Sequence, residues 1–193
     1  MTLVLCLVLA MAAPAQSPQL KARPGRSSDA DALQHKLDSI RRNAQRPLPA
    51  PVTTTLLEAE VNAWFASSYA QLPRGVKALR LTGENGHVTA NAKVDFDEIT
   101  EGRAASNPLL AIFRGLHEVE VVATGHAAAG QATVHVQSVA LDGVSIPSVV
   151  LQFFIEKFLQ PRYPNVGLDT RFTPGYRIDS AQIGAHALTV VQK

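Results

Sequence analysis

The chain has 193 residues, of which 46% are hydrophobic, with 18 Lys and Arg against 16 Asp and Glu. This length and composition fit one globular domain with short extensions, long enough to bury a core. The only cysteine is Cys6, which excludes a disulfide framework, so the core must hold the fold without covalent cross-links.

Residues 1–15 have the pattern of a signal peptide. Residues 2–12 form an apolar run too short to span a bilayer, and the small-x-small sequence Ala13-Pro14-Ala15 follows. No Lys or Arg precedes the run, which departs from the usual pattern. We expect cleavage before Gln16 and export, to the periplasm or the extracellular space of a bacterial cell envelope. A retained membrane anchor is the alternative.

Residues 16–52 form a predicted basic leader. Residues 16–50 carry seven Lys and Arg against three Asp. Apolar residues at helical spacing predict a helix over about Asp29–Ala44, and a Pro-rich linker follows over Arg46–Pro51. Such a leader can make peripheral contact with an anionic membrane, each cation adding about 1 kcal/mol near the surface, or it is simply solvated. Nucleic acid is not an expected partner, because no aromatic residues are interleaved with the cations.

Residues 53–193 form the predicted domain, which opens with a long helix over Thr55–Gln71. Thr55 and Glu58 have the spacing of a capping box, and Pro73 stops the helix. The apolar residues of this helix are spaced for burial against a sheet: Leu57, Val61, Trp64, Phe65 and Leu72.

The apolar period changes to two after Gly75, which indicates strands. A strand over Val76–Leu81 leads to Asn85-Gly86, the sequence of a type I′ hairpin turn, and a second alternating strand follows it. Two further strands are predicted at about 118–125 and 131–141, joined by a short turn. The last strand, about 176–191, changes phase between Ala185 and Leu188, which indicates a bulge or a sharp bend.

Two helical insertions interrupt the predicted sheet, one over Asn107–Gly115 and one over Pro147–Gln160. The second has large apolar residues around most of its circumference, with a thin polar stripe of Gln152, Glu156 and Gln160. Such a helix must be covered, because each large apolar side chain left exposed forfeits about 1.5–3 kcal/mol. A curled sheet, a second chain or an apolar ligand would each cover it, and plain core packing remains open.

Three segments, Thr55–Trp64, Leu116–Phe158 and Phe172–Ile178, resemble uncharacterised bacterial envelope proteins that are similar to the tubular lipid-binding (TULIP-like) superfamily. The resemblance covers about Thr53–Gln192. It is a pattern of hydrophobicity and turns, without an invariant chemical motif. It implies a strongly curved antiparallel sheet wrapped around a long helix, an apolar tunnel for a phospholipid or glycolipid, and no catalytic residues.

The predicted fold is therefore α+β, with a strongly curved antiparallel sheet wrapped around a long N-terminal helix and with additional short apolar helices. The expected function is to bind a lipid or another apolar small molecule for sequestration or transfer in the cell envelope. The alternative is an interaction module that docks through its apolar helix on an envelope protein partner or a second copy of the chain. The residues expected to line the ligand site are Trp64, Phe65, Ile112, Phe113, Val150, Phe153, Phe154 and Phe158.

No sequence motif indicates catalysis. The patterns Gly-x-Ser-x-Gly and Ser-x-x-Lys are missing, as are a Cys–His pair and a phosphate-binding glycine loop. His126 and His135 flank a predicted turn, but no zinc-binding spacing accompanies them. The acidic group over 95–101 lacks the spacing of a calcium loop. We therefore expect no enzyme activity, no metal and no cofactor.

Overall fold

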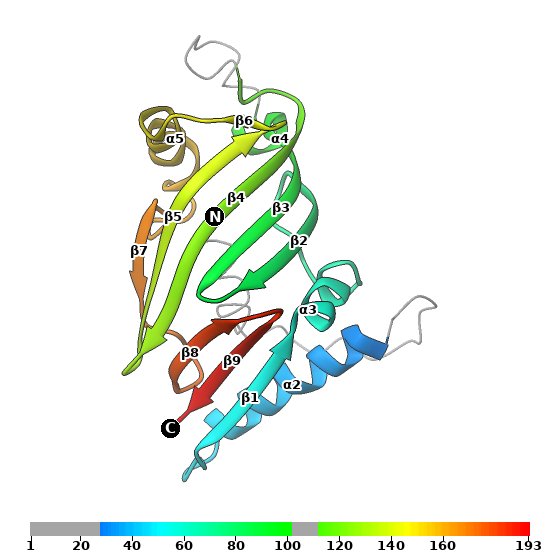
Figure 1. The fold of residues 1–193 in the computed structure, drawn as a ribbon, viewed down its shortest axis with the longest axis vertical. Helices are drawn as coiled ribbons and strands as arrows, with labels where there is room; N and C mark the ends of the chain where they lie inside the picture. Colours follow the sequence, from blue (N-terminus) through cyan, green and yellow to red (C-terminus); the bar gives the residue numbers. More distant parts are fainter. Residues whose placement is uncertain (1–27, 102–111) are drawn as a thin grey trace.

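The computed structural model describes residues 28–101 and 112–193 (Figure 1). The strands of this described part form one nine-stranded antiparallel sheet. Four long strands follow one another as neighbours: β2 (Val76–Glu84), β3 (His87–Asp95), β4 (Leu116–Ala128) and β5 (Gln131–Leu141). Two short strands, β6 (Val144–Ser145) and β7 (Asp169–Phe172), pair with β5. The predicted signal peptide and most of the predicted insertion Asn107–Gly115 lie outside the described residues.

The remaining strands extend the sheet beyond the end of β3. They are β8 (Ile178–Gly184), β9 (Ala187–Gln192) and β1 (Val52–Leu57), in that order from β4. β3 leaves β4 at Thr124, and β8 takes up the same edge at His126 and Ala127. The Gly86 amide of the β2–β3 turn donates to the Ile183 carbonyl at 2.8 Å. The two groups of strands therefore continue each other along one edge of β4, as Figure 1 shows.

The core lies on one face of this sheet. Along β4, Val119, Val121 and Ala123 are buried, while the alternating residues Glu118 and Glu120 are exposed. The other long strands alternate in the same way. This pattern belongs to an antiparallel sheet with one covered and one solvated face, as the period of two predicted. Helices and loops cover the apolar face in two separate places.

Helices α2 (Ser28–Ala44) and α3 (Glu58–Phe65) cover one of them. Leu33 of α2 is buried in the same apolar cluster as Trp64 and Phe65 of α3. The Trp64 indole also donates to the Gln34 amide oxygen at 2.9 Å. The predicted helix over Asp29–Ala44 is confirmed, and the core that it joins is that of the domain predicted to begin at residue 53.

The long helix predicted over Thr55–Gln71 is wrong. Thr55 lies in β1 and pairs with Thr189 of β9, and α3 runs only from Glu58 to Phe65. Three successive threonines at 53–55 favour a strand, and the C-terminal strand supplies its partner. The Leu57 amide donates to the Glu60 carboxylate at 3.0 Å, so Glu60 provides half of a capping box two residues later than predicted. A sheet wrapped around a long N-terminal helix is therefore not supported.

The single last strand predicted over 176–191 is also wrong. It is a hairpin, with β8 and β9 paired from Gly184–Ala187 outward. Ala185 and His186 form the turn, and His186 has φ of 53°. The change of phase in the sequence thus marks a reversal of the chain, where a bulge or bend was expected.

The second covered part of the sheet lies under α4 (Phe96–Thr100), α5 (Ser148–Phe154) and the π-helical turn η3 (Ile155–Leu159). The predicted helix over Pro147–Gln160 is thus confirmed in outline. Its apolar circumference is not fully covered, because Val149 is 75% exposed and Phe153 38% exposed. No helix within the described ranges is long and apolar enough to cross a bilayer.

Candidate ligand-binding site

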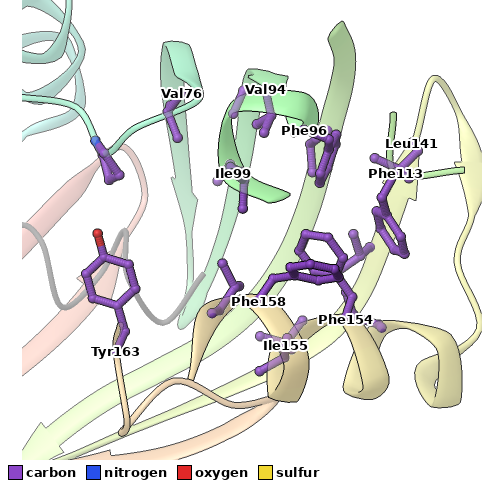
Figure 2. A pocket seen from close by; sticks show the side chains of 18 of the residues that line it. Val76, Val94, Phe96, Ile99, Phe113, Leu141, Phe154, Ile155, Phe158 and Tyr163 are labelled. Carbon is purple, nitrogen blue, oxygen red and sulfur yellow. The ribbon is translucent and has the colours of Figure 1, made fainter. Parts of the chain in front are cut away.

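An apolar cavity lies between the sheet and the α5–η3 helix. Its volume is about 150 Å³, counted as the space that the centre of a water molecule can reach. Its sheet side is made by β2, β3, β4 and β5, and the side chains of α5 and η3 point at this wall from below in Figure 2. The residues contributed by α5 and η3 are Leu151, Phe154, Ile155, Phe158 and Leu159.

Four phenylalanines close one end of the cavity. Phe154 of α5 packs on Phe113 with ring centroids 4.2 Å apart and on Phe96 of α4 at 5.5 Å. Phe158 follows Phe154 at 5.2 Å. These distances are those of stacked and edge-to-face aromatic pairs, which hold one another in place. Phe113 is only 1% exposed, so this end of the cavity is a packed wall.

Small side chains on β3 leave the space between the sheet and α5–η3 unfilled. Ala90 and Ala92 both line the cavity, on the face of β3 that also carries Val94. Leu or Val at these positions would extend toward α5 and occupy that volume. Ala90 and Ala92 therefore leave room between the sheet and α5.

Two partly exposed arginines form the charged part of the cavity lining, which we call the mouth of the cavity. Arg74, just before β2, and Arg162, just after η3, both line it, and the Arg74 and Arg162 side chains are 60% and 39% exposed. The Arg74 guanidinium donates to Glu101 Oε1 at 3.2 Å, and the Arg162 guanidinium donates to the same oxygen. Arg162 also donates to the Ile99 carbonyl at 3.4 Å. Tyr163 lies at this side of the cavity in Figure 2.

The structure brings some of the expected site residues together and separates others. Phe113, Phe154 and Phe158 line the cavity. Val150 packs against the surrounding cluster without lining the cavity. Phe153 and Ile112 do not line the cavity and are 38% and 44% exposed.

Trp64 and Phe65 were also expected at the site. Both lie in the other apolar cluster, under α2, with ring centroids 5.5 Å apart. They do not line the cavity and serve as core of the α2–α3 part.

Sequence reasoning missed the mouth entirely. Among the described residues that line the cavity, the polar side chains are Arg74, Arg162 and Tyr163. Arg162-Tyr163 directly follows the apolar helix, and Arg74 directly precedes the first strand of the β2–β5 group. The only feature of the sequence that points to the mouth is that each arginine lies close to one end of an apolar segment that lines the cavity.

One histidine beside the cavity lies between two hydrogen-bond acceptors. The two His117 ring nitrogens lie 2.6 Å from Asp142 Oδ2 and 2.6 Å from the Arg114 carbonyl. Both partners accept, so both ring nitrogens donate. The Asp142 carboxylate raises the pKa of His117, and the same hydrogen bond lowers the pKa of Asp142. This pair fixes the chain beside the Phe96 ring, whose centroid is 5.9 Å from that of His117.

The two histidines that flank the predicted turn, His126 and His135, make exposed contacts between neighbouring strands. His135 Nδ1 lies 2.5 Å from Asp169 Oδ1, which links β5 to β7. His126 Nε2 lies 3.3 Å from the Thr133 hydroxyl across the β4–β5 hairpin. No group of three His, Cys, Asp or Glu side chains suited to a metal ion occurs within 28–101 and 112–193.

Comparison with known proteins gives no match: no family model fits the sequence, and no curated protein or solved structure is significantly similar to the chain. The resemblance to the tubular lipid-binding superfamily therefore stays a prediction. What the chain binds has to be inferred from the cavity itself.

Proposed function

We propose that the protein binds a lipid or another apolar small molecule in the cavity between the sheet and α5–η3, and that it acts by sequestration or transfer in the cell envelope. The observation that carries the proposal is the cavity itself: about 150 Å³ with apolar walls and a polar mouth. Ligand sites have this composition, with mostly hydrophobic walls and a few polar groups that fix orientation.

The energetics of an empty cavity support an occupant. Engineered apolar cavities of comparable volume take up small apolar molecules. Unfilled apolar space leaves its lining side chains without dispersion partners on one side. An apolar ligand restores the missing dispersion contacts and removes its own apolar surface from water. Alanine at positions 90 and 92 keeps this space available where larger residues would fill it.

The first test is to find what the protein carries. The mature chain is purified without detergent, measured by native mass spectrometry and extracted with organic solvent. A stoichiometric lipid or apolar molecule supports the proposal and identifies the ligand class. A protein that stays empty after incubation with envelope lipids contradicts it.

A matched pair of variants ties binding to the cavity. Ala92→Leu adds volume inside the cavity, whereas Ala140→Leu adds the same atoms to the outward face of β5. We expect Ala92→Leu to lower the amount of bound lipid and Ala140→Leu to leave it unchanged, as measured by extraction from protein of equal thermal stability. Equal retention by the two variants would place the ligand elsewhere.

One observation favours the alternative, a docking module. Val149 and Phe153 of α5 are exposed on the side of the helix away from the cavity. Two large apolar side chains on one helix can serve as anchors for a protein partner or a second copy of the chain. Size-exclusion chromatography over a range of concentrations distinguishes the two: a dimer that a Val149→Asp/Phe153→Asp double substitution dissolves favours docking.

A further inference from the structure

Two cationic side chains reach the mouth of the cavity. Two guanidinium groups, of Arg74 and Arg162, reach it from segments far apart in the sequence, and the Glu101 carboxylate lies between them. Nearby, Lys77 is paired with Glu98, at 2.5 Å, so that pair adds no net charge. Arg74 and Arg162 are the charged side chains of the described cavity lining.

The geometry already accommodates a carboxylate at this place. Glu101 Oε1 accepts from Arg74 and from Arg162, so the two guanidinium groups converge on a single anionic oxygen. Each guanidinium has five N–H donors arranged for carboxylate and phosphate oxygens. Within the described residues these hydrogen bonds and the one to the Ile99 carbonyl use only part of that capacity. Both side chains are partly exposed, so an incoming group can reach them.

We infer that the ligand is an amphiphile with an anionic head group, bound with its apolar tail in the cavity and its head group at Arg74 and Arg162. This inference rests on the proposed function and specifies its ligand. The apolar walls select the tail by desolvation, and the two arginines select the head group by charge and by paired hydrogen bonds. A neutral amphiphile with the same tail fills the same cavity but gains nothing from the arginines.

A pair of ligands with one tail tests this directly. Dodecanoate and 1-dodecanol are titrated into the full-length mature protein, and affinity is measured by isothermal calorimetry. We expect dodecanoate to bind about threefold to tenfold more tightly, the range for partly exposed charge pairs. Raising the salt concentration should narrow the difference, since screening weakens exposed charge interactions.

Three variants assign the effect to the mouth. Arg74→Gln/Arg162→Gln should remove the preference for dodecanoate and leave dodecanol binding unchanged. Glu101→Gln should increase the preference, because it removes the competing carboxylate. Arg171→Gln, on exposed β7, is the matched control and should change neither affinity.

The outcomes separate this inference from the proposed function. If both ligands bind equally and the double variant behaves like the wild type, the anionic head group is wrong and the apolar cavity still binds. If neither ligand binds the wild type, the proposed function fails as well. A preference that persists in the double variant would place the head group away from these arginines and overturn the inference.

Discussion

His117 Nδ1 lies 2.6 Å from Asp142 Oδ2, and this contact joins the start of β4 to the turn between β5 and β6. The Glu118 amide donates to the other Asp142 oxygen at 2.9 Å, so the carboxylate bridges two consecutive residues. Phe113, which closes the cavity, lies four residues before His117. The pair therefore holds one end of the cavity wall.

The first prediction concerns pH and this pair. The folded protein raises the pKa of His117 through its hydrogen bond to Asp142. A raised folded pKa gives stabilisation that is complete below the unfolded value of about 6.5 and is lost as the pH rises through the folded value. Thermal denaturation should therefore show the wild type more stable than His117→Gln at mildly acidic pH, with the gap closing at alkaline pH. A gap that is independent of pH would mean that His117 is not charged in the fold.

The second prediction compares two adjacent phenylalanines. Phe154 is 3% exposed and contacts three other phenylalanine rings, whereas Phe153 faces outward. We expect Phe154→Ala to lower the free energy of unfolding by about 3–5 kcal/mol, the usual cost of removing a buried aromatic ring. Phe153→Ala should cost far less, within about 1 kcal/mol. Urea denaturation measures both, and similar losses would contradict the orientation of α5.

The burial of Phe154 changes how the site should be probed. As a lining residue, Phe154 would be the obvious position for a charged substitution that blocks lipid binding. Because the side chain sits within an aromatic cluster, a carboxylate there would be desolvated without a partner. We now expect Phe154→Asp to unfold the α5 part, visible as lost helical circular dichroism, so substitutions at Ala92 are the better test. A folded Phe154→Asp variant would show that this end of the cavity is open to water.

The third prediction concerns a buried amide that fastens α2 to the end of the chain. The Gln192 side chain, in a residue 1% exposed, donates to the Ile40 carbonyl at 2.9 Å and the Tyr176 carbonyl at 2.7 Å. Gln192→Leu keeps the size and removes both donors. Leaving these acceptors unpaired should cost about 1–3 kcal/mol of unfolding free energy. Thr189→Val, a similar-sized change on the same strand, is the control, and an equal loss in both would argue against the amide's role.

The fourth prediction is that α2 is required for a stable domain. Leu33 is buried among Val61, Trp64 and Phe65, and the Lys36 ammonium lies 2.7 Å from the Glu60 carboxylate. A chain that begins at residue 53 would expose this surface. We expect it to unfold at a lower temperature and to aggregate, whereas a chain that begins at residue 28 should match the mature protein. Equal melting temperatures would show that the leader is independent of the domain.

The β2–β5 part of the sheet could be predicted because its turns and its buried face are determined by residues close together in the sequence. Its two hairpin turns have positive φ at both central positions: 41° at Asn85 and 86° at Gly86, then 50° at Ala129 and 71° at Gly130. Alternating apolar residues fix which face of each strand is buried. Neither signal needs information from elsewhere in the chain.

The errors come from partners distant in sequence. Residues 55–58 have the spacing of a helix start, but pairing with 187–192 makes β1 a strand. The mouth of the cavity could not be predicted for the same reason. Arg74 and Arg162 converge on Glu101 only because the sheet and α5–η3 bring their segments together. Tertiary contacts overrode local preference at the first site and created the second.

The pairing of β1 with β9 also bears on when the molecule can fold. Residues 52–57 can pair only after residues 187–192 have been synthesised. Pairing between segments this far apart in sequence carries a large loop-closure cost and therefore forms late. If the first fifteen residues direct export as predicted, the precursor meets the translocation machinery before β9 can pair with β1. A precursor without this pairing is still unfolded in part, which is the state that can pass through a secretion channel.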